Sequence, residues 1–214
     1  MKKHTKASSG TLWIIGSYLA SRCIRLASNV ILTRLLFPEA FGLMMLVQVF
    51  IHGFTMISDI GLRMNVVTSQ RGDDPEFLNN TWTLQILRGA AIWLLVIIGS
   101  FPLAEFYGQS QLQSILIVAG ATAFIHGFDS TGVNTSSRDV RFARLSVLQV
   151  VAPIVGAVLT IAYAWFYPSV WALVFGSVGA TLFRCILSHR VFHETHNKPA
   201  WNSIYITEIF KIGK

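Results

Sequence analysis

The strongest constraint in this sequence is a succession of six apolar segments, each about as long as a helix that crosses a lipid bilayer. A spanning helix needs about 20 largely apolar residues, at ~1.5 Å of rise each, to cross ~30 Å of hydrocarbon. Turn signals such as Phe37-Pro38-Glu39 and Tyr107-Gly108-Gln109 separate the segments. We predict an all-α fold, a polytopic membrane helix bundle. The six predicted spans are residues 11–35, 40–62, 82–104, 112–132, 144–166 and 169–188.

The composition excludes a soluble protein. Of the 214 residues, 53% are hydrophobic and 13% are charged, and the mean hydropathy is +0.55, whereas soluble domains carry about 25% charged residues. The apolar surface therefore exceeds what one soluble core can bury, which excludes a soluble enzyme. For the same reason, nucleic-acid binding is a poor explanation of the net charge of +7. Cys23 and Cys185 both lie in apolar segments, which excludes a disulfide framework.

Lysine and arginine are concentrated in the connections on one side of the predicted membrane spans. The connections on one side contain Glu39 and Glu105 but no lysine or arginine. Because cytoplasmic loops of membrane proteins are enriched in basic residues, both termini are predicted to be cytoplasmic. The basic residues on the cytoplasmic side are Lys2, Lys3, Lys6, Arg63, Arg71, Arg138, Arg141, Arg144, Arg190, Lys198, Lys211 and Lys214.

The sequence carries no signature of catalysis. The outward connections are under about ten residues each, too short for an extracytoplasmic active site, and there is no glycine-rich phosphate loop, nucleophile elbow or pocket of paired carboxylates. We predict a protein that is not an enzyme, with no catalytic residue and no cofactor. The glycosylation sequon Asn79-Asn80-Thr81 falls on the cytoplasmic side and is interpreted as chance.

Polar residues inside several spans recur at helical spacing, so each of these spans carries one polar stripe. Arg22 and Arg25 are three residues apart near the middle of the first span and therefore share a face. Ionisable groups at this depth cost about 2.5 to 3.5 kcal/mol and normally face a cavity, which predicts a bundle around a water-accessible, partly cationic cavity. The candidate cavity residues are Arg22, Arg25, Ser28, Asn29, Gln48, Arg88, Gln149 and Arg184, and the candidates for ion coupling are His52, Asp59, His126 and Asp129.

Structural roles compete with each of these assignments. Arg34, Arg88 and Arg184 lie near a membrane face, where a long side chain reaches the headgroups. Asp59 and Asp129 are close enough to the cytoplasmic ends to pair with loop arginines. An internal ion pair of Arg22 or Arg25 with one of these aspartates would only hold the bundle together.

The C-terminal residues divide the chain into two predicted parts. Residues 1–188 form the transmembrane lobe, and residues 189–214 form a cytoplasmic amphipathic tail that leads toward a missing second lobe. The tail places Trp201, Tyr205, Ile209 and Ile212 on one face, as in a helix lying on the cytoplasmic leaflet. The preceding group of His189, His193, Glu194 and His196 mimics metal-ligand spacing, but it lacks the H-E-x-x-H pattern and a second cluster, so we predict no metal site.

Four stretches of the chain carry a resemblance to a known family: Ile31 to Gly42 (ILTRLLFPEAFG), Ile57 to Arg63 (ISDIGLR), Arg138 to Phe142 (RDVRF) and Ile209 to Lys211 (IFK). They resemble bacterial polysaccharide and O-antigen flippases, lipid-linked oligosaccharide transporters of the multidrug/oligosaccharidyl-lipid/polysaccharide exporter superfamily. The resemblance covers essentially the whole chain and implies one six-helix lobe, the N-terminal half, of a two-lobe exporter that works by alternating access. It also implies a multi-pass protein of the bacterial cytoplasmic (inner) membrane.

The resemblance implies a substrate and partners. The substrate would be an undecaprenyl-pyrophosphate-linked oligosaccharide moved across the membrane for polysaccharide or lipopolysaccharide O-antigen biosynthesis, with H⁺ or Na⁺ as a possible coupling ion. Arg22 and Arg25 suit the pyrophosphate oxygens. Further partners would be the lipid bilayer and polysaccharide polymerase or assembly proteins. Two alternatives stay open: a multidrug or organic-cation exporter of the same superfamily, and a non-transporting membrane scaffold.

Overall fold

The computed structural model describes residues 2–58, 66, 69, 71, 74–138, 142–193, 195 and 197–212, although not the side chains of residues 2–14, 137–138, 142–143 and 210–212. In the part of the chain that it describes, the regular elements are all helices, with no strand. The helices are α1 (Lys2–Leu35), α2 (Pro38–Ile57), α4 (Pro75–Phe106), α5 (Ser110–Gly127), α6 (Gly132–Arg138), α7 (Phe142–Phe166), α8 (Val170–Val191) and α9 (Ser203–Ile212).

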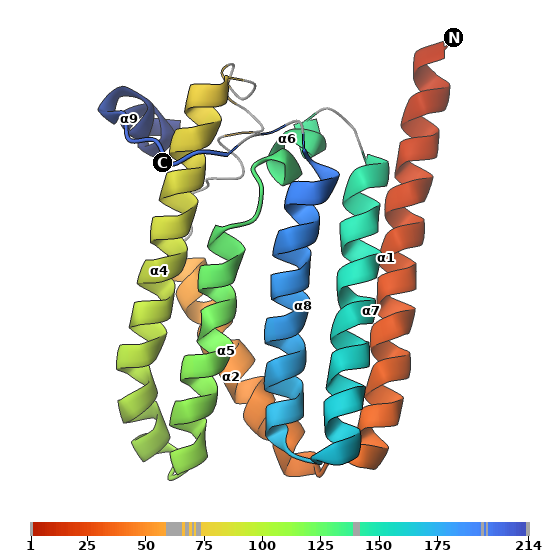
Figure 1. Ribbon diagram of the computed structural model, residues 1–214, viewed down its shortest axis with the longest axis vertical. Coiled ribbons are helices and arrows are strands. Elements are labelled where there is room, and N and C mark those ends of the chain that lie inside the picture. The colour runs from red at the N-terminus through yellow and green to blue at the C-terminus, as the bar shows by residue number, and fades with distance from the viewer. Residues whose placement is uncertain are drawn as a thin grey trace.

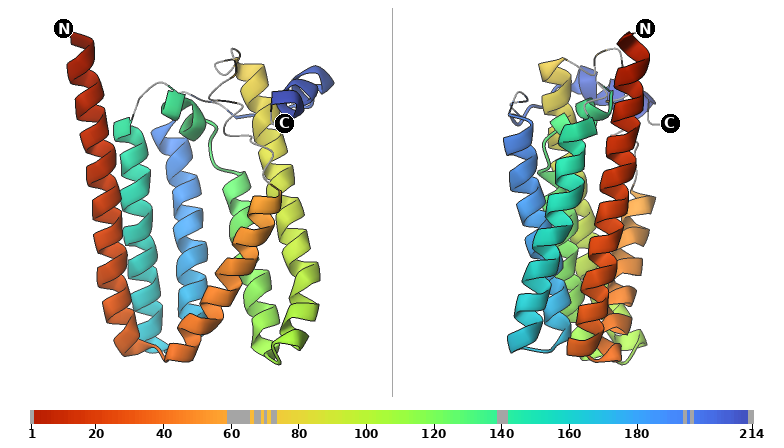
Figure 2. Two further views of the ribbon diagram at one scale, coloured as in Figure 1. Left: turned by 180° about the vertical axis from the view of Figure 1, so that it is seen from behind. Right: turned by 90° about the vertical axis from the view of Figure 1, so that its right-hand side faces the viewer.

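The long helices stand side by side in a bundle. In Figure 1 the order across the bundle is α4, α5, α8, α7 and α1, and the neighbours in this order pack against one another. Helix α2 crosses obliquely over α4, α5 and α8 (Figure 2). Helices α1 and α2 are joined at one end of the bundle and diverge toward the other. The N-terminus, α6 and α9 lie at that other end.

Proline and glycine mark the ends of the helices. Pro38 and Pro75 occupy the first turns of α2 and α4, where a missing N–H costs nothing. Asp74 caps α4 by accepting a hydrogen bond from the backbone of Glu76 at 3.0 Å. Gly108 has a φ of 62° in the tight turn between α4 and α5, a conformation that only glycine adopts without strain. These short turns hold consecutive helices antiparallel.

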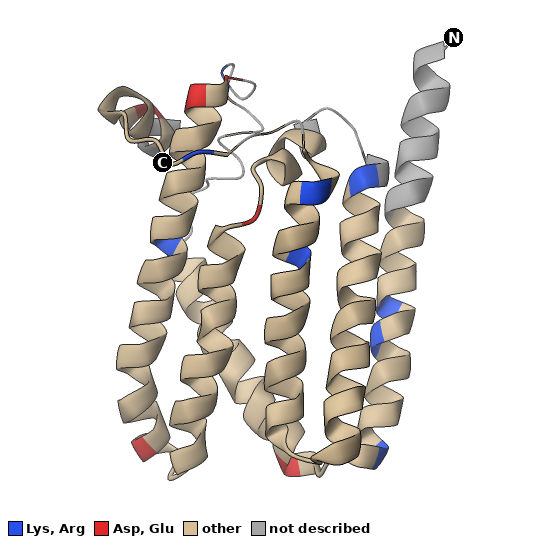
Figure 3. Cartoon of the chain, in the orientation of Figure 1, with Lys and Arg blue, Asp and Glu red and all other residues tan. Residues whose placement is uncertain are grey.

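Within the described residues, four helices are long and apolar enough to cross a membrane: α2, α4, residues 144–166 of α7, and α8. The prediction of a polytopic helical membrane bundle is thus confirmed. The count of six spans stays a prediction, because α1 carries Arg22, Arg25 and Arg34, and α5 has only 18 residues with glutamines in its first turn. Figure 3 shows that the charged residues lie mostly toward the ends of the helices, with few in between.

The predicted span 112–132 differs from the structure. Helix α5 ends at Gly127, and the separate helix α6 begins at Gly132. The C-terminal end of α5 is held by a side chain of α4: the Gln85 amide donates to the carbonyls of His126 and Gly127, each at 3.2 Å. Bonds from a distant helix therefore end α5, and local hydropathy does not contain that information.

Helices α4 and α5 approach each other closely through glycine. A Cβ atom on Gly89 would lie 2.8 Å from the carbonyl oxygen of Ala123, and one on Gly127 would lie 3.0 Å from that of Gln85. Small residues let helix backbones approach in this way inside membranes. The main apolar core lies in the same region, between α2, α4, α5 and α8, and includes the buried Val47, Val96 and Leu116.

Candidate functional site

The two predicted cavity arginines lie on the exposed side of α1. Arg22 and Arg25 are both exposed. The Arg22 guanidinium donates to the Tyr18 hydroxyl at 2.6 Å and lies 4.8 Å from the centre of the Tyr18 ring. Arg25 makes no hydrogen bond or ion pair with any other described residue. Asn29, one turn further along, is also exposed, so α1 presents two cations and an amide that no described carboxylate neutralises.

Ser28, another predicted cavity residue, lies on the packed side of α1 together with two further serines. Ser17, Ser21 and Ser28 are buried, and Ser17 donates to Gln149 of α7 at 3.2 Å. Ser28 donates to the Ile24 carbonyl of its own helix at 2.9 Å. The structure therefore divides the stripe into a serine edge that packs on α7 and an arginine edge that does not, while Gln149 stays exposed beside the seam.

The predicted residues of α2 are separated from α1 by the divergence of the two helices. Gln48 is half-buried and His52 is exposed. Asp59, the third polar candidate of this span, lies outside the described residues.

Arg88 of α4 reaches the end of α2. It donates to the Thr55 carbonyl at 2.9 Å and to the Ser58 hydroxyl at 3.3 Å. A cation at a helix C-terminus satisfies unpaired carbonyls and the negative end of the helix dipole. This geometry gives Arg88 a role in joining α4 to α2.

Three predicted residues meet where α5 ends beside α8. Asp129 Oδ2 lies 3.3 Å from His126 Nδ1 and 3.4 Å from Arg184 Nη2. The Asp129 side chain is almost fully buried, and its Oδ1 is a buried acceptor without a hydrogen-bond partner. The sequence suggested a loop arginine as the partner of Asp129; among the described side chains the partner is Arg184, a helix residue. A buried carboxylate oxygen without a partner among the described residues is an acceptor that a proton or a cation would satisfy.

The backbone around this cluster is held by Gln85, which the sequence did not single out, and by His189, which the sequence singled out only for its metal-ligand spacing. Gln85 also donates to the carbonyl of Asp129 at 3.2 Å, and His189 Nε2 lies 2.8 Å from the carbonyl of Phe128. Because a carbonyl only accepts, His189 must carry its proton on Nε2. These contacts fix the position of Asp129 from α4 and α8, and they depend on tertiary structure that spacing alone does not reveal.

An extended segment, residues 197–202, runs along α4 and is called the strap. Its backbone donates to α4 side chains at every second residue, and Pro199, which has no N–H, takes an intermediate position. The asparagines of the sequon are among the acceptors, so their role is to hold the strap. The bonds are Lys198 to Asn79 Oδ1 at 2.9 Å, Ala200 to Thr83 Oγ1 at 3.0 Å and Asn202 to Asn80 Oδ1 at 2.7 Å.

Helix α9 docks on the start of α4. Ile209 is fully buried with Phe77 and Leu78, and the Tyr205 hydroxyl donates to Asp74 at 3.2 Å. Partial burial and the Asp74 carboxylate raise the pKa of Tyr205 above its usual value of 10.0. The predicted apolar face of α9 is thus divided: Tyr205 and Ile209 pack on protein, while Trp201, just before the helix, is exposed.

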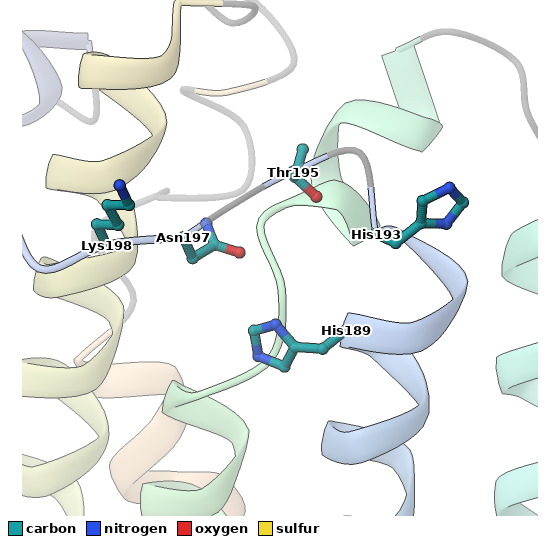
Figure 4. A pocket seen from close by; sticks show the side chains of 5 residues that line it. All are labelled: His189, His193, Thr195, Asn197 and Lys198. Atoms are coloured by element: carbon teal, nitrogen blue, oxygen red, sulfur yellow. The ribbon is translucent and has the colours of Figure 1, made fainter.

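The histidine group borders a shallow pocket of about 320 Å³, shown in Figure 4, that is lined by His189, His193, Thr195, Asn197 and Lys198. Glu194 and His196 lie outside the described residues. Within the described chain, no group of three or more histidine, cysteine or acidic side chains is arranged to hold a metal ion.

Together, the apolar helices and the few charges within the bundle define a polytopic membrane protein. The chain belongs to a family of polysaccharide biosynthesis proteins, whose sequence profile matches residues 31–214. It is also similar to an uncharacterized membrane protein in the cps region of Klebsiella pneumoniae, with 24% identity over 214 residues. That alignment covers 99% of this chain but only 43% of the relative, so the chain spans less than half the relative's length. No solved structure matches.

Proposed function

We propose that this chain is the N-terminal lobe of a flippase that moves undecaprenyl-pyrophosphate-linked oligosaccharide from the cytoplasmic to the outer leaflet of the bacterial inner membrane. Membership of a polysaccharide biosynthesis family and several membrane-crossing helices support a transport role. The lobe would comprise residues 1–188, with the tail 189–214 leading to a second lobe, and transport would proceed by alternating access.

The observation that carries the proposal is the pair of arginines on α1. Arg22 and Arg25 are exposed in the middle of α1, and no described carboxylate pairs with them. Leaving two cations at this depth is costly unless an anion or water meets them. A pyrophosphate has several oxygens that accept the paired N–H donors of guanidinium groups. An exporter of organic cations would gain nothing from these charges.

The sugar part of the substrate requires neutral polar groups beside the arginines. Asn29 and Gln149 are exposed and offer amides, and Gln48 on α2 is half-buried. Ser28 has already used its hydroxyl proton within α1. We therefore assign the sugar contacts to the amides, with Ser28 supporting the packing of α1 on α7.

The cluster of His126, Asp129 and Arg184 is the proposed coupling site. The unused Oδ1 of Asp129 would accept a proton or Na⁺, and the His126 imidazole lies beside the other carboxylate oxygen, with Nδ1 3.3 Å from Oδ2. Binding there would weaken the attraction between Asp129 and Arg184 and so loosen α5 from α8. His52 and Asp59 remain further candidates for coupling.

The test is the double variant Arg22→Ala with Arg25→Ala in the native protein, expressed in its host. We expect surface polysaccharide to be lost and lipid-linked oligosaccharide to accumulate on the cytoplasmic leaflet, with the membrane level of the protein unchanged. The matched control is Arg34→Ala, which removes a cation from the end of the same helix and should leave output near normal. Normal polysaccharide from the double variant would refute the role of the arginines, and loss without accumulation of the lipid-linked precursor would favour a scaffold.

A further inference from the structure

Residues 129–131, called the junction, connect α5 to α6 and are bound to α8. Asp129 Oδ2 lies 3.4 Å from Arg184 Nη2, and the next backbone N–H, that of Ser130, donates to Ser188 Oγ at 3.0 Å. Arg184 and Ser188 are four residues apart on α8 and therefore share a face. Both serines are almost fully buried. The carboxylate of the coupling site is thus the first of a series of contacts between the junction and α8.

Asn197, the first residue of the strap, binds the other two residues of the junction. Its Oδ1 accepts from Ser130 Oγ at 3.1 Å and from the N–H of Thr131 at 3.3 Å, and its Nδ2 donates to Thr131 Oγ1 at 2.6 Å. Figure 4 shows the Asn197 amide directed toward the chain between α5 and α6. Because Ser130 and Thr131 are buried, leaving either without a partner is costly, so the amide holds the strap on the junction.

From Asn197 onward the strap is bound to α4 and leads into α9. Its N–H groups at Lys198, Ala200 and Asn202 donate to α4 side chains, and α9 begins at Ser203. A segment whose backbone is bonded at alternate residues moves with the elements that it binds, unlike a loop whose backbone meets only water. The junction and α9 are therefore joined through Asn197.

We propose that Asn197 transmits the charge state of Asp129 to the strap. While the carboxylate is charged, its attraction to Arg184 holds the junction on α8, and Asn197 holds the strap on the junction. Binding of the coupling ion neutralises the carboxylate and removes this attraction, so the junction shifts and its bonds to Asn197 weaken. Asn197 is thus a positioning residue, which acts through the junction and touches no transported molecule.

The role of this link in transport rests on the proposed function, in which Asp129 binds the coupling ion and the strap leads to a second lobe. Occupation of the coupling site would then alter the connection between the two lobes, which gives ion binding an effect on the exchange between their arrangements. The link itself does not depend on which molecule is transported. It is tested without transport, so failure of the test on the α1 arginines leaves it intact.

The test measures hydrogen exchange of the strap in the native protein in nanodiscs, by mass spectrometry of peptides that cover residues 198–202. Asp129→Asn keeps the shape of the side chain and removes its charge. We expect amide exchange in the strap to become about tenfold faster, because the strap opens more often once its first anchor is weakened. Arg184→Gln breaks the same contact from α8 and should give the same result.

Two backgrounds separate transmission through Asn197 from a general loss of stability. In Asn197→Ala the amide that binds the junction is absent, so adding Asp129→Asn should change strap exchange by less than about twofold. The matched control is Thr83→Ala, which removes the α4 acceptor of Ala200 and leaves Asn197 in place. In that background Asp129→Asn should still accelerate exchange about tenfold.

Two results would overturn the proposal. One is strap exchange that neither Asp129→Asn nor Arg184→Gln changes, since the charge at the junction would then have no effect on the strap. The other is equal acceleration in the Asn197→Ala and Thr83→Ala backgrounds, which would show that the charge acts through overall stability and not through Asn197.

Discussion

At the scale of single residues, the charges inside the bundle fall into two kinds. Arg88 and Arg184 have protein partners, on α2 and at Asp129 respectively, whereas Arg22 and Arg25 have no acidic partner among the described residues. Burial of an ion is tolerated when a partner compensates for lost hydration. The first kind therefore holds helices together, and the second is available to a ligand.

The pairing of Asp129 with Arg184 predicts a compensating double substitution. Asp129→Asn leaves Arg184 without its anion, and Arg184→Gln leaves the buried carboxylate with only His126, so each alone should destabilise the protein by about 3 kcal/mol. The double variant should be less destabilised than the sum of the two, because neither charge is then left alone. Chemical unfolding in detergent measures all three. Strict additivity would show that the 3.4 Å contact contributes nothing to stability.

At the scale of helices, hydropathy predicted where most elements lie, since every predicted span has a helical counterpart. It missed the break after Gly127, the start of α4 at Pro75 and the docking of α9 on protein. The first and the last of these depend on side chains more than 30 residues away in sequence, such as Gln85 bound to the carbonyl of Gly127 at a separation of 42 residues, whereas α4 begins at the local signals of Asp74 and Pro75. Spacing within one segment cannot contain such information. For the same reason the polar stripes were identified, but not the partner of Asp129.

The close approach of α4 and α5 predicts that substitution by alanine changes stability differently at two glycines, Gly89 and Gly53. Gly89→Ala would place a methyl group 2.8 Å from the Ala123 carbonyl oxygen, so the helices must separate, and we expect a loss of about 1 to 3 kcal/mol. Gly53→Ala in α2 meets nothing within 4 Å. It should be neutral or stabilise by up to about 1 kcal/mol, because alanine favours the helix. Melting temperatures of the two variants test this; similar behaviour would show that α4 and α5 are not in contact at Gly89.

At the scale of the whole molecule, the bundle has two unlike ends. One end contains only tight turns, which join α1 to α2, α4 to α5 and α7 to α8. The other contains α6, the strap, α9 and the pocket with Lys198. Together with the distribution of basic residues along the sequence, this asymmetry predicts that the end with α6, the strap and α9 faces the cytoplasm.

Cysteine labelling tests that orientation. In a variant without Cys23 and Cys185, a cysteine replacing the exposed Gln109 lies in a tight turn, and one replacing the exposed Ser203 lies at the start of α9. A membrane-impermeant thiol reagent should label the first in intact cells with an opened outer membrane, and the second only after the inner membrane is permeabilised. The reverse pattern would invert the topology, and the cysteine-free protein serves as the blank.

The path of the strap is determined by side chains that lie outside it, on α4. Its donors are backbone N–H groups, which nearly every residue possesses, while the acceptors are the specific side chains of Asn79, Asn80 and Thr83. In random mutagenesis we therefore expect substitutions to be tolerated at Ala200 of the strap but not at the three α4 positions, because those side chains determine the path of the strap. Its course is encoded 117 to 122 residues earlier in the gene, so a strap transplanted without its α4 would lose its shape.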